Sequence, residues 1–270
     1  MDLKTLQDTP PWDWPEGVGE LLRGILCDNR AEESERLLAA ELAADMTVIS
    51  DELADTLLSI ARSGDETDVL RAQAVLSLGP VLEYADTDEF EDHEEVPISE
   101  ETFHGIRKML RRLYTDAAVP KEVRRRVLET SVRAPQDWQQ DAIRAAYYSG
   151  DESWMLTAVF CMRFVQGFND QILEALESEN QDVHYEAVCA AGNWEVGAAW
   201  SHIAGLVAAK ETDKPLRLAA IDALAGIRPQ EAAAILVELT DSDDEDIVEA
   251  AYEAMSVAEA FLDDGDESRH

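Results

Sequence analysis

Residues 182–192 read Asp-Val-His-Tyr-Glu-Ala-Val-Cys-Ala-Ala-Gly, and this stretch decides the fold. An apolar anchor, Val183, is followed four positions later by a small residue, Ala187, and three positions after that by another, Ala190. Residues at these spacings lie on one face of an α-helix, where small side chains let a second helix approach closely. The stretch therefore predicts a helix packed tightly against a partner helix.

The same pattern recurs along the chain at a spacing of about 31 residues. Its apolar anchors are Leu70, Val123, Trp154, Val183, Leu216 and Ile247. Four of the five steps between anchors span 29 to 33 residues, whereas the step from Leu70 to Val123 spans 53 and indicates an insertion. A period of this length is typical of stacked repeats, and here the repeating unit is predicted to be a pair of helices.

Residues 182–192, together with residues 213–225, resemble the short HEAT repeats of the bilin-lyase type, with an acidic start, an apolar-Arg step and an Ala-rich continuation. The resemblance covers roughly residues 20–260. It implies an all-α, armadillo-like fold: a right-handed α-α superhelix, that is, a HEAT-like solenoid of about seven helix pairs. It says little about function, because the family includes scaffolds, adaptors, lyases, hydroxylases and DNA-repair enzymes.

The chain divides into three predicted parts. Residues 1–19, rich in proline, form an extended N-terminal cap segment; Trp12 and Trp14 either cover the apolar edge of the first helix pair or dock on a partner. Residues 20–262 form the solenoid, with an acidic loop inserted at 85–98 and a helix beginning after Ser99 as N-cap. Residues 263–270 form a disordered tail.

The chain is strongly acidic, with 58 acidic and 22 basic residues and a formal charge of −36 at pH 7. Such a surface argues against nucleic acid as the main ligand. The excess of acid is consistent with an ordinary acidic cytosolic protein or with adaptation to high salt.

The N-terminus lacks the basic and apolar run of a secretory signal, and no segment approaches the ~20 apolar residues of a membrane span. The three cysteines, Cys27, Cys161 and Cys189, are odd in number and fall in predicted helices. These features predict a reduced, cytoplasmic protein that does not associate with membranes. Cys161 occupies a small-residue repeat position and is predicted to be buried.

Basic residues are concentrated directly after the acidic loop. Arg107 and Arg111 share a face of one predicted helix, and Arg124 and Arg125 lie at the start of the next predicted helix. Either the acidic loop folds onto this cluster in a charge network, or the cluster binds an acidic peptide, a phosphate group or an acidic face of another subunit.

Aromatic residues are concentrated in the segment from Trp138 to Trp200, which contains 10 of the 18 aromatic residues in the chain. Most are expected to pack in the core. Four lie near predicted helix ends or turns and are candidates for exposed partner contacts. With the arginines, the candidate binding residues are Tyr147, Tyr148, Trp194, Trp200, Arg107, Arg111, Arg124 and Arg125.

Catalytic constellations are not recognisable in the sequence. A di-iron HEAT hydroxylase needs several His-Glu pairs at equivalent repeat positions, but only His93-Glu94 is adjacent. A phosphate-binding glycine loop, a zinc-type cysteine pair and a nucleophile elbow are also missing. No catalytic residue, metal ligand or cofactor is therefore predicted.

The sequence favours a non-catalytic scaffold or adaptor that binds a protein or peptide on the concave surface of the solenoid. The alternative is a small-molecule lyase or chaperone, for a tetrapyrrole-like pigment, because bilin lyases share the repeat. The predicted oligomeric state is a monomer or a weak dimer, since strong self-repulsion opposes association.

Overall fold

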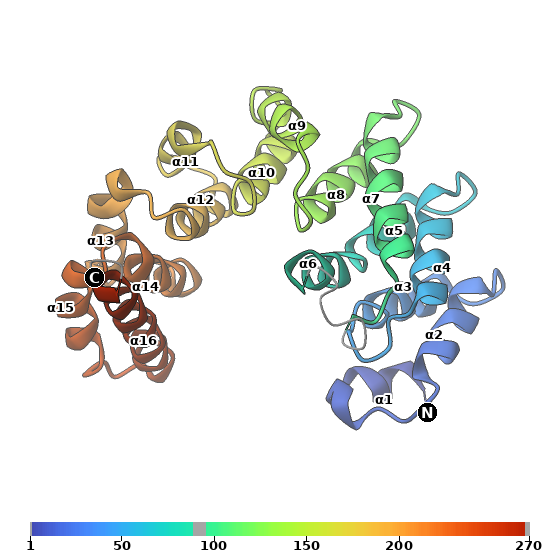
Figure 1. The fold of residues 1–270 in the computed structure, drawn as a ribbon, viewed down its shortest axis with the longest axis horizontal. Helices are drawn as coiled ribbons and strands as arrows, with labels where there is room; N and C mark the ends of the chain where they lie inside the picture. The colour runs from blue at the N-terminus through green and yellow to red at the C-terminus, as the bar shows by residue number, and fades with distance from the viewer. Residues whose placement is uncertain (1, 89–95, 268–270) are drawn as a thin grey trace. The chain divides into compact units, whose positions relative to one another are not determined.

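The structure, a computed structural model, describes residues 2–88 and 96–267, with side chains described as far as Ala258. All regular secondary structure in these ranges is helical, which confirms the predicted all-α class (Figure 1). The chain forms two compact units, an N-terminal unit of residues 1–142 and a C-terminal unit of residues 143–270.

The N-terminal unit consists of short helices joined by tight turns. Those lying wholly within it are α1 (Leu3–Gln7), the 3₁₀ turn η1 (Pro11–Asp13), α2 (Val18–Cys27), α3 (Glu33–Leu42), α4 (Asp51–Arg62), α5 (Asp68–Leu76), α6 (Gly79–Asp88), α7 (Glu100–Thr115) and α8 (Lys121–Ser131). Helix α9 (Trp138–Tyr147) spans the boundary between the units.

The C-terminal unit is also built from helices joined by turns. Its helices are α10 (Glu152–Cys161), α11 (Asn169–Ala175), α12 (Gln181–Asn193), the 3₁₀ turn η2 (Gly197–Ala199), α13 (Trp200–Ala208), α14 (Lys214–Ile227), α15 (Pro229–Leu239) and α16 (Glu245–Glu267).

The six sequence anchors occupy one structural position. Each anchor is the third residue of its helix, in α5, α8, α10, α12, α14 and α16. The residue four positions after each anchor is completely buried in all six helices: Ala74, Val127, Ala158, Ala187, Ala220 and Ala251. The residue three positions further on is also buried in every copy. The predicted face of small side chains is therefore the packing face.

Helices pack as the repeat predicts. In the N-terminal unit α5 packs against both α3 and α8. Helix α4 packs against α5, the helix that follows it, and α7 packs against α8 in the same way. In the C-terminal unit α12 lies between α10 and α14, and α14 also contacts α16 (Figure 1). Helices α11, α13 and α15 each pack against the repeat helix that follows them. Adjacent helix pairs are thus confirmed within each unit.

The closest approach between repeat helices is at Gly192, near the end of α12. A Cβ atom on Gly192 would lie 2.8 Å from both the Cα and the Cβ of Ala223 on α14. Real Cβ atoms do not tolerate such contacts, so the absence of a side chain at residue 192 is a condition of this packing.

An arginine, buried or half-buried, joins the two helices of several pairs. Arg71, the fourth residue of α5, donates from Nε to the backbone oxygen of Ala61 at 3.1 Å. Arg217, the fourth residue of α14, donates in the same way to Val207 at 3.0 Å. Arg36, at the equivalent position of α3, binds Leu26 through Nε and Nη2 at 3.2 and 2.9 Å. In each case the acceptor is the penultimate residue of the preceding helix, whose carbonyl has no partner within its own helix.

The N-terminal segment differs from the extended chain expected for residues 1–19, because it contains α1 and η1 before α2 begins at Val18. Trp14 packs on the first helices: its indole Nε1 donates to the carbonyls of Leu6 and Thr9 at 3.0 and 2.9 Å, and its ring packs on the core. Trp12 instead is 78% exposed, because it projects from the 3₁₀ turn.

Four further expectations can be compared with the structure. Ser99 caps α7 as predicted, accepting from the N–H of Thr102 at 3.2 Å. Helix α6 continues to Asp88, so residues 85–88 of the expected acidic loop are helical, and residues 89–95 lie outside the described part of the chain. Helix α16 continues to Glu267, although a disordered tail was expected from residue 263. Cys161 is fully buried, as its repeat position predicted.

Candidate functional site

A polar hollow of about 460 Å³ lies in the C-terminal unit beside Trp194, one of the four predicted aromatic contacts. The turn between α10 and α11 and the first residues of α11 form most of its wall. Its lining residues are Gln166, Gly167, Asn169, Asp170, Gln171 and Trp194. Three of the six, Gln166, Asn169 and Gln171, carry amide side chains, which can both donate and accept hydrogen bonds.

Trp194 is positioned by the end of α12. Its backbone N–H donates to the carbonyl of Ala190 at 3.2 Å and ends the helix, and Glu195 then adopts a left-handed conformation with φ of 50°. The indole Nε1 donates to the backbone oxygen of Met162 at 2.6 Å, which fixes the half-buried ring against the turn after α10. The ring is therefore a rigid wall of the hollow.

Tyr148 extends this site onto the surface. Its side chain is 65% exposed, and its hydroxyl accepts a hydrogen bond from Nε2 of Gln171 at 3.0 Å. Because Gln171 lines the hollow, this bond links the exposed phenol to the hollow. We refer to the six lining residues plus Tyr148 as the Trp194–Tyr148 site.

Tyr147, also a candidate contact, is only 6% exposed and belongs to the core. Its hydroxyl donates to the backbone oxygen of Gln171 at 3.4 Å, and its ring meets that of Tyr148 edge-on at 5.0 Å between centroids. Burial, followed by the carboxylate of Glu174, raises the pKa of Tyr147. The expectation that Tyr147 is an exposed contact is therefore wrong, because its ring is buried and its hydroxyl reaches the backbone of α11.

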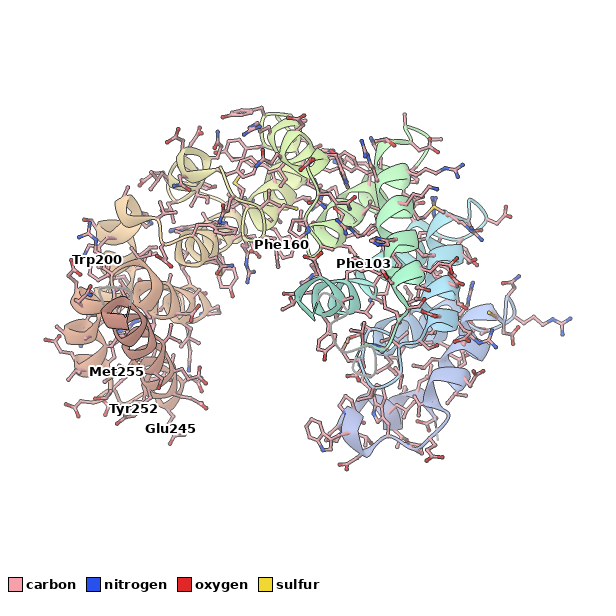
Figure 2. The ribbon with its side chains drawn as sticks, in the orientation of Figure 1. Phe103, Phe160, Trp200, Glu245, Tyr252 and Met255 are labelled. Carbon is pink, nitrogen blue, oxygen red and sulfur yellow. The ribbon has the colours of Figure 1, made fainter. Side chains whose placement is uncertain are left out.

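Trp200 lies outside the hollow. It is half-buried at the start of α13 (Figure 2), and the guanidinium of Arg228 stands 5.6 Å from its ring centroid. An arginine over an indole face is a favourable cation–π contact. The ring of Trp200 is therefore already in contact with Arg228, a residue of the same unit.

The four candidate arginines belong to the N-terminal unit and do not form one exposed cluster. Arg107 donates to the carbonyl of Pro135 at 3.2 Å and lies 5.1 Å from the ring of Phe103, while Arg111 is exposed. Both line an open hollow of about 640 Å³ with Trp138 and Asp141.

The other two candidate arginines lie on α8. Arg125 is buried and paired with Glu122 at 2.8 Å and Glu129 at 3.8 Å, so the proposal of Arg125 as a surface contact is wrong. Arg124 is half-buried. Neither alternative for the acidic loop is decided, because residues 89–95 lie outside the described ranges.

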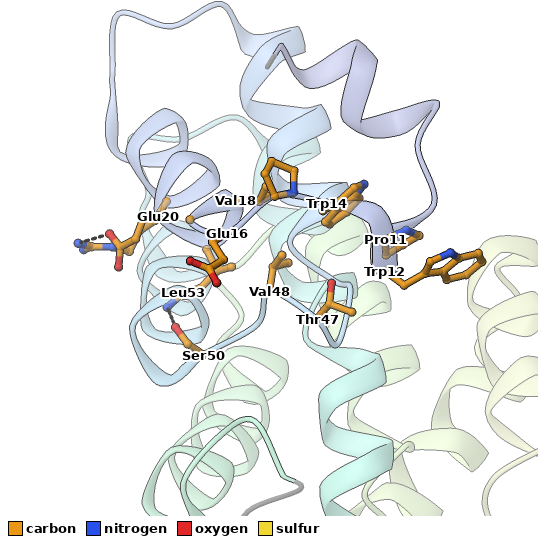
Figure 3. A pocket seen from close by; sticks show the side chains of 14 residues that line it. Pro11, Trp12, Trp14, Glu16, Val18, Glu20, Thr47, Val48, Ser50 and Leu53 are labelled. Carbon is orange, nitrogen blue, oxygen red and sulfur yellow. Dashed lines mark hydrogen bonds and ion pairs between the residues drawn. The ribbon is translucent and has the colours of Figure 1, made fainter.

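A hollow that the sequence reasoning missed lies beneath the N-terminal segment (Figure 3). It measures about 430 Å³, and its walls include Trp14, Val48 and Leu53. The sequence alone does not indicate it, because it depends on the close approach of α2 to the turn before α4: a Cβ on Gly19 would lie 2.8 Å from the carbonyl oxygen of Val48.

In the described part of the chain, residues 2–88 and 96–267, no three His, Cys, Asp or Glu side chains are grouped closely enough to hold a metal ion. None of the described helices is both long enough and apolar enough to cross a membrane.

Comparison with known proteins confirms the type of repeat. A family model described as HEAT repeats matches residues 169–256, which contain Asn169, Asp170, Gln171 and Trp194 of the Trp194–Tyr148 site. This part of the chain is therefore made of HEAT repeats, as the sequence resemblance predicted. Curated protein sequences give no match.

Several solved structures show distant similarity. Human deoxyhypusine hydroxylase in complex with glycerol is 15% identical, with a TM-score of 0.41, and the match covers 96% of this chain and 88% of that one. An engineered protein is 16% identical with a TM-score of 0.42, covering 89% and 78%, and another is 16% identical with a TM-score of 0.37, covering 91% and 98%. At these scores none of them bears on the function.

Proposed function

We propose that the protein is a non-catalytic scaffold or adaptor whose Trp194–Tyr148 site binds a peptide segment of a partner protein. The observation that carries this proposal is the combination of an exposed aromatic side chain with an adjoining amide-lined hollow. Exposed aromatic residues are frequent anchors of protein interfaces. Amide side chains can pair with the N–H and C=O groups of a bound peptide backbone.

The partner segment should be neutral or basic. The chain carries a formal charge of −36, and Asp170 lies in the hollow itself. Complementary charge accelerates association and disfavours partners of like charge. HEAT repeats commonly provide surfaces for protein association, and the matched repeats at 169–256 contain most of the site.

Selection from a displayed peptide library, followed by affinity measurements in solution, tests this proposal. The selected peptides should bind the wild-type protein and lose at least about tenfold in affinity, about 1.4 kcal/mol, in both Tyr148→Ala and Gln171→Ala. Tyr252→Ala is the matched control, because Tyr252 is 57% exposed on α16 of the same unit (Figure 2).

Equal loss of affinity in the Tyr252 control would show a non-specific effect and contradict the proposal. Purification of the protein with a coloured small molecule, together with failure to select any peptide, would support the tetrapyrrole-like alternative instead.

A further inference from the structure

Helix α12 carries a histidine at the position where several other helices carry an arginine. His184 is the fourth residue of α12, the position of Arg36, Arg71 and Arg217 in their own helices. Those arginines bind the penultimate carbonyl of the preceding helix. The equivalent carbonyl here belongs to Glu174 of α11.

The imidazole of His184 instead meets a second imidazole. Its Nε2 atom lies 2.9 Å from Nε2 of His202 on α13, and the rings are inclined at 70° with centroids 5.1 Å apart. Both histidines are half-buried. Two converging ring nitrogens from adjacent helices are the arrangement of a chelating pair.

A carboxylate orients the second ring. Oε1 of Glu177 lies 3.4 Å from Nδ1 of His202, which favours a proton on Nδ1 and leaves a lone pair on Nε2. A carboxylate behind a histidine in this way is typical of metal-bound imidazoles, since it fixes the tautomer and makes the ligand nitrogen more basic.

The space between the two rings holds one proton, because Nε2 of His184 and Nε2 of His202 lie 2.9 Å apart, the distance of a single hydrogen bond. Burial, followed by the neighbouring His202, lowers the pKa of His184.

We propose that His184 and His202 together bind one divalent transition-metal cation of the Zn²⁺, Ni²⁺ and Cu²⁺ class through their Nε2 atoms. Metal–nitrogen bonds are about 2.0–2.1 Å long, so two nitrogens on one cation can be at most about 4 Å apart. The observed 2.9 Å lies within this limit. On binding, the proton between the rings moves to Nδ1 of His184, and each Nε2 gives its lone pair to the cation.

The site is an exchangeable one with water in the remaining positions. Among the described side chains no third His, Cys, Asp or Glu completes a group that could hold a metal by itself. Imidazole ligands suit zinc, copper and nickel, whereas magnesium and calcium prefer oxygen. The bound cation would clamp α12 to α13 within one repeat. This proposal is independent of peptide binding.

Calorimetric titration of untagged protein with Zn²⁺, in the presence of excess Mg²⁺ to occupy surface carboxylates, tests the proposal. We expect one Zn²⁺ per chain and at least a tenfold loss of affinity in His184→Arg and in His202→Gln. His184→Arg introduces the arginine found at this position in α3, α5 and α14, so it should fold at least as stably as the wild type without metal. Glu177→Gln should weaken binding by about tenfold.

His104→Gln is the control, because His104 is an exposed histidine of the N-terminal unit beside Glu100 at 3.4 Å. It should leave Zn²⁺ affinity unchanged. Absence of saturable Zn²⁺ binding to the wild type, or undiminished binding in both His184→Arg and His202→Gln, would overturn the proposal. A rise in Tm on adding Zn²⁺ should likewise occur in the wild type and the control and be lost in both variants.

Discussion

At the scale of single residues, the arginine at the fourth helix position explains how one helix of a pair is attached to the next. Arg71 is 6% exposed, and its guanidinium bonds to the otherwise unpaired carbonyl of Ala61. The apolar-Arg step in the sequence is therefore a connection between helices. This role was not evident from the sequence, because the acceptor lies ten residues earlier, on a different helix.

Replacing Arg71 with methionine should remove this connection while preserving most of the side-chain volume. The carbonyl of Ala61 would lose its donor, and an unsatisfied buried acceptor costs about 1–3 kcal/mol. Urea unfolding of Arg71→Met would measure the loss. Arg62→Met is the control, since Arg62 is exposed and should change stability by less than about 0.5 kcal/mol. Equal effects in both variants would contradict the assigned role.

The pairing of Arg36 with Glu66 should make stability depend on pH. The two side chains form two hydrogen bonds of 2.7 Å each, and the bond from Arg36 lowers the pKa of Glu66 in the folded state. A lowered folded pKa stabilises the protein above the usual glutamate value of about 4.3, and this contribution is lost as pH falls through the folded pKa.

The wild type should therefore be more stable than Glu66→Gln at pH 7, and the difference should shrink as pH falls below about 4.3. Urea unfolding of the two proteins across this pH range measures it. A difference that is constant with pH would mean that Glu66 acts through packing rather than charge.

The contrast between Tyr147 and Tyr148 shows where sequence reasoning stops at this scale. The two residues are adjacent, and both fall where α9 ends. Composition and spacing could not tell which faces α11, because the burial of each ring depends on the direction that the chain takes after the helix. The same limit applies to Arg124 and Arg125, of which the second turns toward Glu122 and Glu129.

At the scale of helices, the repeat pattern predicted the packing faces correctly. The anchor is the third residue of all six repeat helices, and the position four residues later is completely buried in each. Small residues at helical spacing are informative because their placement reflects contact between helices, which is the same in every repeat. The irregular elements, α1, η1 and the end of α6, carry no repeat and were not predicted.

Gly192→Ala should destabilise the protein by about 1–3 kcal/mol, because the added methyl group meets the Cα of Ala223 at 2.8 Å and α12 must move away from α14. Thermal or urea unfolding would measure this loss.

Gly205→Ala provides the matched comparison. Gly205 lies within α13 with no other atom within 4 Å of the added Cβ, so this change should stabilise the helix by up to about 1 kcal/mol. If Gly192→Ala were as stable as Gly205→Ala, this result would contradict the close packing of α12 against α14 at Gly192.

At the scale of the whole molecule, the charge dominates the behaviour in solution. The formal charge of −36 means that the many carboxylates repel one another in the folded state, which lowers the stability of the fold. Exposed ion pairs stabilise the fold by only about 0–1 kcal/mol each. Salt weakens both the repulsion between carboxylates and the attraction within ion pairs. The repulsion is the larger of the two, because acidic residues outnumber basic ones by 58 to 22.

Added salt should therefore stabilise the protein. The screening length falls from about 30 Å at 0.01 M to about 8 Å at 0.15 M, so the urea midpoint should rise over this range. The midpoint measured in a neutral buffer at several NaCl concentrations checks this expectation. A midpoint that falls with added salt would show that attractive pairs outweigh the repulsion.

The central claim is that a peptide partner binds the Trp194–Tyr148 site, and hydrogen–deuterium exchange with and without a selected peptide tests it most directly. We predict that protection increases at residues 166–171, at the end of α12 around Trp194 and at Tyr148. Protection confined to other segments, with these residues unchanged, would contradict the claim.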